Sequence, residues 1–359
     1  MDSSTLFGIA TLGYILAMIA YISYLVFKNE LIGKIATGIT VISFLSQTVA
    51  FFLRWFEFYN TMGVPIWRPP ITNLYESLIF FVWCLILGYL IIEFRYKTRA
   101  FGAFITPIAG LALAFIEMSG MSKGLQPLVP ALQSNWLLAH VTMSFVSYST
   151  FAISFGTGLM YLIEKTEKRS EPAYIFWTVS LGILIILLVA MGLDYLKYHV
   201  VATNPETVSY LFKATFKSSS AMVSLISWIV AFTVLALIWR YGYVLKRVVA
   251  AFNVTPALLE ELTYKSIAVG FPIFTLGGLI FGAIWADQAW GVYWSWDPKE
   301  TWSLITWFIY AFFLHARLIR GWRGNKVAIV AVLGFVTVIF TYLGVNLLLS
   351  GLHSYGGMN

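Results

Sequence analysis

Ten apolar runs, each about as long as a membrane-spanning helix, are the feature that most constrains this chain of 359 residues. A hydrocarbon core about 30 Å thick requires roughly 20 apolar residues in each helix that crosses it. Runs of this kind lie near residues 6–27, 33–54, 73–94, 100–118, 137–163, 173–195, 221–243, 263–286, 301–319 and 327–349. Because backbone polar groups find no water inside a bilayer, each run is predicted to be a helix. The predicted fold class is an all-α polytopic membrane protein with about ten transmembrane helices.

The composition supports this class and excludes several others. Hydrophobic residues make up 60% of the chain and charged residues 11%, whereas soluble domains carry about 25% charged residues. The single cysteine, Cys84, excludes an intrachain disulfide, a CxxC redox pair and a thiolate zinc site. The net charge of +7 comes from short basic clusters between the apolar runs, a pattern that sets membrane orientation. We therefore expect no nucleic-acid partner.

The distribution of Lys and Arg predicts the orientation, because cytoplasmic loops carry an excess of positive charge. With the N-terminus outside, 16 of the 23 Lys and Arg residues fall on the cytoplasmic side. Both termini are therefore predicted to be extracytoplasmic. In this topology His140 and His353 lie at the outer face, and His199 lies in an outer loop. His315 follows Glu300 in an inward-running helix and lies about 22 Å deeper at the helical rise of 1.5 Å per residue.

The densest local signal is an aromatic stretch at residues 285–302, which is predicted to be an outer loop. Its characteristic residues are Trp285, Trp290, Tyr293, Trp294, Trp296, Asp297 and Trp302. An interfacial aromatic belt, the alternative explanation, would place only one or two such residues at each helix end. We interpret the stretch as a platform on which a planar ligand stacks. With two histidines at the same face, it indicates a porphyrin whose iron takes two axial imidazoles.

These residues resemble a known family. The segment 290–302, Trp-Gly-Val-Tyr-Trp-Ser-Trp-Asp-Pro-Lys-Glu-Thr-Trp, is similar to the tryptophan-rich WWD signature of haem-handling proteins in cytochrome c maturation. Its Asp-Pro-Lys-Glu-Thr-Trp form resembles the CcsA (ResC) branch of System II more than the CcmC and CcmF branches of System I. Residues 73–77, 134–141 and 344–356 also match. The resemblance covers the chain except for about 165–243.

The resemblance implies both a site and a function. His140 and His353 would be the outer axial ligands of non-covalent haem b in transit, His315 would handle haem within the membrane, and residues 285–302 would form the platform. The implied partners are a CcsB/ResB-type membrane protein with a second intramembrane histidine, an apocytochrome c, and a thiol-reducing thioredoxin-like protein outside the membrane. The implied function is haem delivery and attachment to a CxxCH motif by a cytochrome c synthase complex. Its location would be the bacterial cytoplasmic (inner) membrane, with the active site on the extracytoplasmic face.

Residues 165–243 depart from the short members of this family by adding two spans and an outer loop. The expected organisation is an N-terminal membrane core at 1–164, an inserted hairpin at 165–243 and a C-terminal core at 244–359. His199 lies in the insertion and matches no family ligand, so we interpret it as a solvated or packed loop histidine. For His140 and His315, packing at a helix start and hydrogen bonding to a neighbouring helix are the respective alternatives to haem binding.

Some roles stay open at the level of sequence. Glu76 could tie helices together or contact the ligand, and Arg54 and Arg68 could pair with haem propionates. Asp297 is expected to form hydrogen bonds within its turn, not to be catalytic. Two other functions remain: a haem exporter without synthase activity, which shares the same sites, and a bis-histidine b-type carrier that oxidises quinol. The latter normally needs a second pair of ligands across the bilayer.

Overall fold

The computed structural model describes residues 2–63, 68–71, 73–118, 123–125, 133–196, 221–250 and 254–345, and within these ranges it contains helices and no strand. The elements are α1 (Ser3–Phe27), α2 (Glu30–Met62), α3 (Leu74–Tyr96), α4 (Gly102–Met118), α5 (Asn135–Lys165), α6 (Pro172–Leu196), α7 (Ala221–Tyr241), α8 (Tyr243–Ala250), α9 (Pro256–Phe274), η4 (Thr275–Phe281), α10 (Gly282–Trp290), α11 (Pro298–Leu318), α12 (Asn325–Ile339) and η5 (Phe340–Gly344). η4 and η5 are π-helical. As far as its residues are described, each of the ten predicted runs falls on helical elements.

Six helical segments among the described residues are long and apolar enough to cross a membrane. They are Ser3–Phe27, Glu30–Met62, Tyr75–Tyr96, Asn135–Lys165, Pro256–Trp290 and Asn325–Gly344. The runs at 100–118, 173–195, 221–243 and 301–319 form α4, α6, α7 and α11, which are not among these six. The chain is a multi-pass membrane protein, while the number ten and the placement of the termini stay predictions.

Polar residues placed directly before the apolar runs explain where several helices begin. The side chains of Asp2, Asn29, Asn73 and Ser134 accept hydrogen bonds from backbone N–H groups in the first turns of α1, α2, α3 and α5. Such caps satisfy donors that have no partner inside the helix. At the other end of α1, Lys28 takes the left-handed conformation with a φ of 52°. This residue turns the chain directly into α2.

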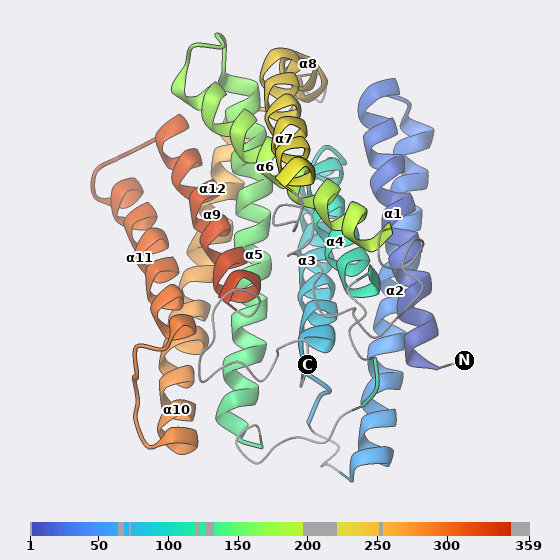
Figure 1. Cartoon of the computed structure of the whole chain (residues 1–359), viewed down its shortest axis with the longest axis vertical. Helices are drawn as coiled ribbons and strands as arrows, with labels where there is room; N and C mark the ends of the chain where they lie inside the picture. The colour runs from blue at the N-terminus through green and yellow to red at the C-terminus, as the bar shows by residue number, and fades with distance from the viewer. Residues whose placement is uncertain are drawn as a thin grey trace.

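The helix α5 lies at the centre of the bundle in Figure 1, packed against α9 and α12 on one side and against α3 on the other. In its most apolar window 83% of the residues are buried, compared with 33% in α1 and 28% in α2. Hydroxyl groups buried on α5, such as those of Ser147 and Thr157, donate to carbonyl groups of the same helix. α5 therefore joins an N-terminal group of helices, α1–α4, to a C-terminal group, α9–α12.

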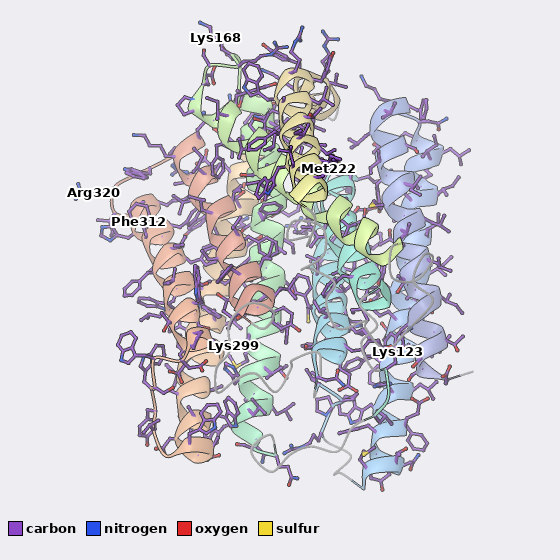
Figure 2. All side chains as sticks on the ribbon, viewed as in Figure 1. Lys123, Lys168, Met222, Lys299, Phe312 and Arg320 are labelled. Carbon is purple, nitrogen blue, oxygen red and sulfur yellow. The ribbon has the colours of Figure 1, made fainter. Side chains whose placement is uncertain are left out.

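The basic residues labelled in Figure 2 are sorted between the two ends of the bundle. Lys168 and Arg320, both predicted to be cytoplasmic, lie in the upper half of the view. Lys123 and Lys299, both predicted to be extracytoplasmic, lie in the lower half. For these four labelled residues, the two predicted for each side by the positive-inside rule lie in the same half of the view. The start of α5 and the whole of α10 belong to the lower end, as Figure 1 shows.

Candidate functional site

The start of α5 and the segment from η4 to α11 bring the sequence motifs together. The hydroxyl of Ser134, which caps α5, donates to Oε1 of Gln288 in α10 at 2.8 Å. Trp136 in the first turn of α5 packs on Phe281 at the end of η4, with ring centroids 5.3 Å apart. Through these contacts residues separated by 154 positions in the chain become neighbours. The 134–141 motif and the aromatic stretch therefore belong to one site.

His140 lies in the second turn of α5 and is half-buried. Its Nδ1 atom lies 2.8 Å from the carbonyl oxygen of Gly277 in η4. Because a carbonyl oxygen can only accept, this contact requires the imidazole proton on Nδ1. The imidazole also lies nearly parallel to the indole of Trp285, with an angle of 16° and ring centroids 6.3 Å apart. A histidine that donates one ring N–H to a backbone carbonyl has the arrangement usual for a metal-ligating imidazole.

The tryptophans of the aromatic stretch form two edge-to-face pairs in place of one flat surface. Trp285 is buried and meets Trp290 at 66°, with ring centroids 4.8 Å apart. Trp294 meets Trp296 at 87°, with ring centroids 5.8 Å apart. Trp302 packs on a ring of η5 instead. Edge-to-face contact is the preferred geometry for isolated aromatic rings, so a planar ligand would stack on single faces of this cluster and not on a continuous sheet of rings.

Two members of the aromatic stretch are strongly exposed. Tyr293 is 60% exposed and Trp296 is 68% exposed. Trp296 also adopts a φ of +60°, which is uncommon for a residue with a large side chain. Large exposed apolar rings at a loop are typical of interaction surfaces. The stretch therefore offers one pair next to His140, in which Trp285 is buried and Trp290 half-buried, and one partly exposed pair in the loop.

Hydrogen bonds at the start of α11 shape the end of this loop. Asp297 accepts from the backbone N–H of Lys299 at 3.1 Å, while Glu300 accepts from the backbone N–H of Asp297 at 3.3 Å. The two carboxylates form a capping box. The Glu300 carboxylate also accepts from the backbone N–H of Ser295 at 2.7 Å. The expectation that Asp297 shapes its turn is confirmed. Sequence reasoning missed Glu300, although the Asp-x-x-Glu spacing before an apolar run carries the signal.

The ammonium group of Lys299, at the start of α11 and ahead of the predicted span 301–319, has a lowered pKa. Burial lowers the pKa of Lys299 to about 8, and the Asp297 carboxylate opposes part of that shift. Burial acts in this direction because a desolvated ammonium group is less stable than the neutral amine. The charge of Lys299 is therefore lost as the pH rises through about 8. In Figure 2 this residue lies in the lower half of the bundle.

The indole N–H of Trp294 is a buried hydrogen-bond donor that a bound ligand could satisfy. The Nε1 atom of Trp294 is buried and has no hydrogen-bond partner among the described residues. Buried indole N–H groups normally find a partner, and leaving one unsatisfied costs about 1–3 kcal/mol. A carboxylate of a bound porphyrin would supply the acceptor. The site thus offers what a haem requires: an oriented imidazole, aromatic faces and an N–H group for a propionate.

Arg54 and Arg68 are both engaged within the protein. Arg54 in α2 donates from Nε and an Nη atom to Oε1 of Glu76 in α3 at 3.0 and 2.9 Å, and both side chains are buried. A second Nη atom of Arg54 donates to the carbonyl of Lys123 at 2.8 Å. Arg68 donates to the carbonyl of Gln133 at 2.7 Å, directly before α5. Glu76 therefore ties α3 to α2, and both arginines hold the segments that precede the site.

Replacing Glu76 by Gln should destabilise the protein, because Arg54 would keep a buried charge without its counter-ion. Breaking a buried pair by removing one partner typically costs about 3–5 kcal/mol. Glu30→Gln is the matched control, since its side chain is 67% exposed in its ion pair with Arg99 and exposed pairs contribute at most about 1 kcal/mol. Thermal unfolding of the purified variants in detergent measures both effects. Equal losses for the two variants would contradict a structural role for the Arg54–Glu76 pair.

His315 lies away from the other site residues, in the last turn of α11. Its side chain is exposed at the surface of the bundle. Phe312, which precedes it on the same helix, points outward in Figure 2. Within the described part of the chain, no side chain donates to or accepts from the His315 imidazole, and both the haem role and the alternative of a helix-to-helix hydrogen bond stay predictions. His353 and His199 lie outside the described residues.

A large cavity elsewhere in the bundle is a poor alternative site. It has a volume of about 1090 Å³ and lies between the N-terminal and C-terminal groups of helices. Apolar side chains such as Phe81, Phe104, Phe145 and Phe335 line it. No histidine occurs among the described residues of its wall, so this wall offers no imidazole to a porphyrin iron. The start of α5 remains the candidate site.

Comparison with known proteins identifies the family of this chain. The family described as Cytochrome C assembly protein matches residues 71–353, which include the motifs at 73–77, 134–141 and 290–302 and most of the motif at 344–356. The chain is 38% identical to the cytochrome c biogenesis protein CcsA of Gloeobacter violaceus, over 92% of this chain and 89% of that protein. It is 36% identical to CcsA of Pyropia yezoensis, over 96% and 94% of the two chains. CcsA of Microcystis aeruginosa is 38% identical over 80% and 79%.

Proposed function

Because this chain belongs to the cytochrome c assembly family, as a member of its CcsA branch, we propose that it delivers haem across the membrane and presents it for attachment to apocytochrome c. Its role in cytochrome c biogenesis follows from the family. In this role the chain would be one subunit of a synthase complex with a CcsB/ResB-type protein. The complex would reside in the bacterial cytoplasmic membrane, with the attachment site on the extracytoplasmic face.

The observation that carries this proposal is the environment of His140. Its Nδ1–H donates to the Gly277 carbonyl, which leaves the lone pair on Nε2 in the neutral imidazole. The Trp285 ring lies parallel to it, and the buried N–H of Trp294 lacks an acceptor. An imidazole, aromatic faces and a donor for a carboxylate suit haem better than they suit a metal ion alone. His353 supplies the second axial ligand in this proposal.

Two haem positions follow from the separation of the histidines along the chain. His315 lies about 22 Å from Glu300 at the helical rise of 1.5 Å per residue, which is too far for one porphyrin to have its iron on both His315 and an outer ligand. The exposed imidazole of His315 would hold haem at an inner position together with a histidine of the partner. His140 and His353 would then hold it at the outer position.

Attachment requires the protein to position haem and not to supply a nucleophile. Each cysteine thiol of the CxxCH motif adds across a haem vinyl group: the sulfur bonds to one vinyl carbon and the hydrogen to the other, with no net change in electron count. Cys84 lies in α3 and takes no part. The chain contributes binding and orientation, while the reactivity belongs to haem and thiol. A thioredoxin-like partner outside the membrane would keep the substrate thiols reduced.

Covalent haem in a co-expressed cytochrome tests this function. The chain is expressed with a CcsB-type partner and an apocytochrome c in cells that lack their own maturation system. Haem that stays on the cytochrome through denaturing electrophoresis supports the synthase proposal. Haem that reaches the outer side without becoming covalently attached would instead support an exporter. Omitting the CcsB-type partner shows whether the complex is needed.

Replacing both Trp294 and Trp296 by Ala should lower haem content and cytochrome yield severalfold while the protein still inserts into the membrane. The rings lie in a loop, so their loss removes a haem-contacting surface without opening the helix bundle. Trp294→Phe separates the contribution of ring stacking from that of the indole N–H group, because it keeps an aromatic ring and removes the N–H. Trp228→Ala, at an exposed position of α7, is the control for a general belt effect. Full activity of the double variant would favour the belt interpretation.

A further inference from the structure

The π-helix η4 lies directly opposite His140 and interrupts the long helical segment from α9 to α10. Pro272 has no N–H group to donate within α9, and Gly277 and Gly278 are weak helix formers within η4. The Thr275 hydroxyl donates to the carbonyl of Phe271 at 2.8 Å and accepts from the indole of Trp307 at 2.9 Å. Local sequence and packing therefore both loosen the α-helical pattern here, and π-helical turns occur frequently at functional sites.

The π-helix makes a backbone carbonyl available to α5. The oxygen of Gly277 lies 2.8 Å from His140 Nδ1, a contact between residues 137 positions apart. The carbonyl oxygen has no hydrogen to donate, so the ring nitrogen must be the donor in this bond. The contact therefore determines which nitrogen of His140 carries the proton.

Glycines allow this close approach of η4 and α5. A Cβ atom on Gly277 would lie 2.2 Å from Cβ of Met143, which is one turn after His140 on α5. A Cβ atom on Gly282 would lie 2.9 Å from His140 Nδ1 and 3.0 Å from its Cε1. All three distances are shorter than ordinary van der Waals contact. Any side chain at these positions would push α5 or the imidazole away from the Gly277 carbonyl.

We propose that η4 is the positioning element for the outer haem ligand: the Gly277 carbonyl holds the Nδ1 proton of His140, and Gly282 leaves the space in which the ring presents Nε2 to the iron. This inference rests on the proposed haem-binding function and adds the residues that orient the ligand. A hydrogen bond from the non-ligating nitrogen fixes ring orientation and raises the basicity of the ligating one. Gly277 and Gly282 are positioning residues and do not themselves touch haem in this arrangement.

The tautomer of His140 in the haem-free protein is the first test and needs no positioning variant. The protein labelled with ¹⁵N-histidine is studied by solid-state NMR at about pH 8.5, where imidazoles are ordinarily neutral. The His140 signal is assigned by its loss in His140→Gln. We expect a protonated Nδ1 and an unprotonated Nε2. An Nε2–H tautomer overturns the proposal, and it does so whether or not the protein later proves to bind haem.

The second test compares variants of two glycines that face α5 from different helices, Gly282 in α10 and Gly270 in α9. Gly282→Ala should shift the ring of His140, weaken haem binding by about tenfold or more, and raise the haem midpoint potential because the ligand loses electron-donating character. Gly270→Ala is the matched control, since its Cβ would meet Thr150 Oγ1 at 2.1 Å, elsewhere in the α5–α9 contact and not at His140. It should leave the His140 tautomer and the potential unchanged, even if it lowers stability.

The outcomes separate this inference from the function on which it rests. Unchanged haem affinity and potential in Gly282→Ala, or an equal shift in Gly270→Ala, overturn the positioning role while haem binding by the wild type still stands. A wild type without any low-spin haem at the outer site overturns the proposed function itself. If neither glycine variant folds, the wild-type tautomer measurement decides the matter.

Discussion

Replacing His315 by Gly should abolish cytochrome c maturation, although His140 and His353 remain in place. His315 is exposed on α11, and ionisable side chains within membrane helices are uncommon and usually functional. If it holds haem at the inner position, its loss stops haem from reaching the outer one. Added imidazole can occupy the vacated space and ligate the iron, so it should restore part of the cytochrome yield.

The experiment measures haem content, absorbance spectrum and covalent cytochrome yield, with and without imidazole. His199→Gly is the control, because the same substitution is made at a histidine that matches no family ligand. We expect this control to mature cytochrome at the wild-type level. Normal maturation by His315→Gly without imidazole would show that no inner haem position depends on this residue.

Replacing His140 by Gly should leave haem at the inner position and deplete the outer one, the reverse of the distribution expected for His315→Gly. The complex should retain haem at the inner position but lose the low-spin, bis-imidazole spectrum of the outer one. Cytochrome yield should fall to background, because haem with a single outer ligand is not held for the incoming thiols. His353→Gly should behave in the same way, since a bis-imidazole site needs both ligands.

The absorbance spectrum and the step rescued by imidazole distinguish the two classes of variant. In His140→Gly, imidazole should restore the low-spin spectrum together with attachment, whereas in His315→Gly it should first restore haem content. Ser134→Ala is a useful companion, because Ser134 caps α5 near His140 without being a ligand. It should lower stability modestly and keep the spectrum. A low-spin spectrum of wild-type intensity in His140→Gly would remove His140 from the ligand set.

The sequence alone determined the positions and type of the helices. Within the described residues every apolar run forms a helix, because a bilayer leaves a chain no other way to satisfy its backbone polar groups over such a length. One local signal was equally informative, since Asp297 was expected to form hydrogen bonds within its turn and does so at the start of α11. The WWD motif also led to the family directly. These features depend only on residues close together in the chain.

Tertiary structure alone decided how distant residues meet. The bond from His140 to Gly277 spans 137 positions, and the pairing of Arg54 with Glu76 spans 22; no local pattern encodes either contact. The edge-to-face angles among the tryptophans were likewise unforeseen, since ring orientation depends on packing and not on composition. The π-helix η4 lies where the helical segment from α9 to α10 contains Gly277 and Gly278 and contacts α5. Because such features depend on which helices become neighbours in the bundle, periodicity and composition predict the elements but not the geometry of the site.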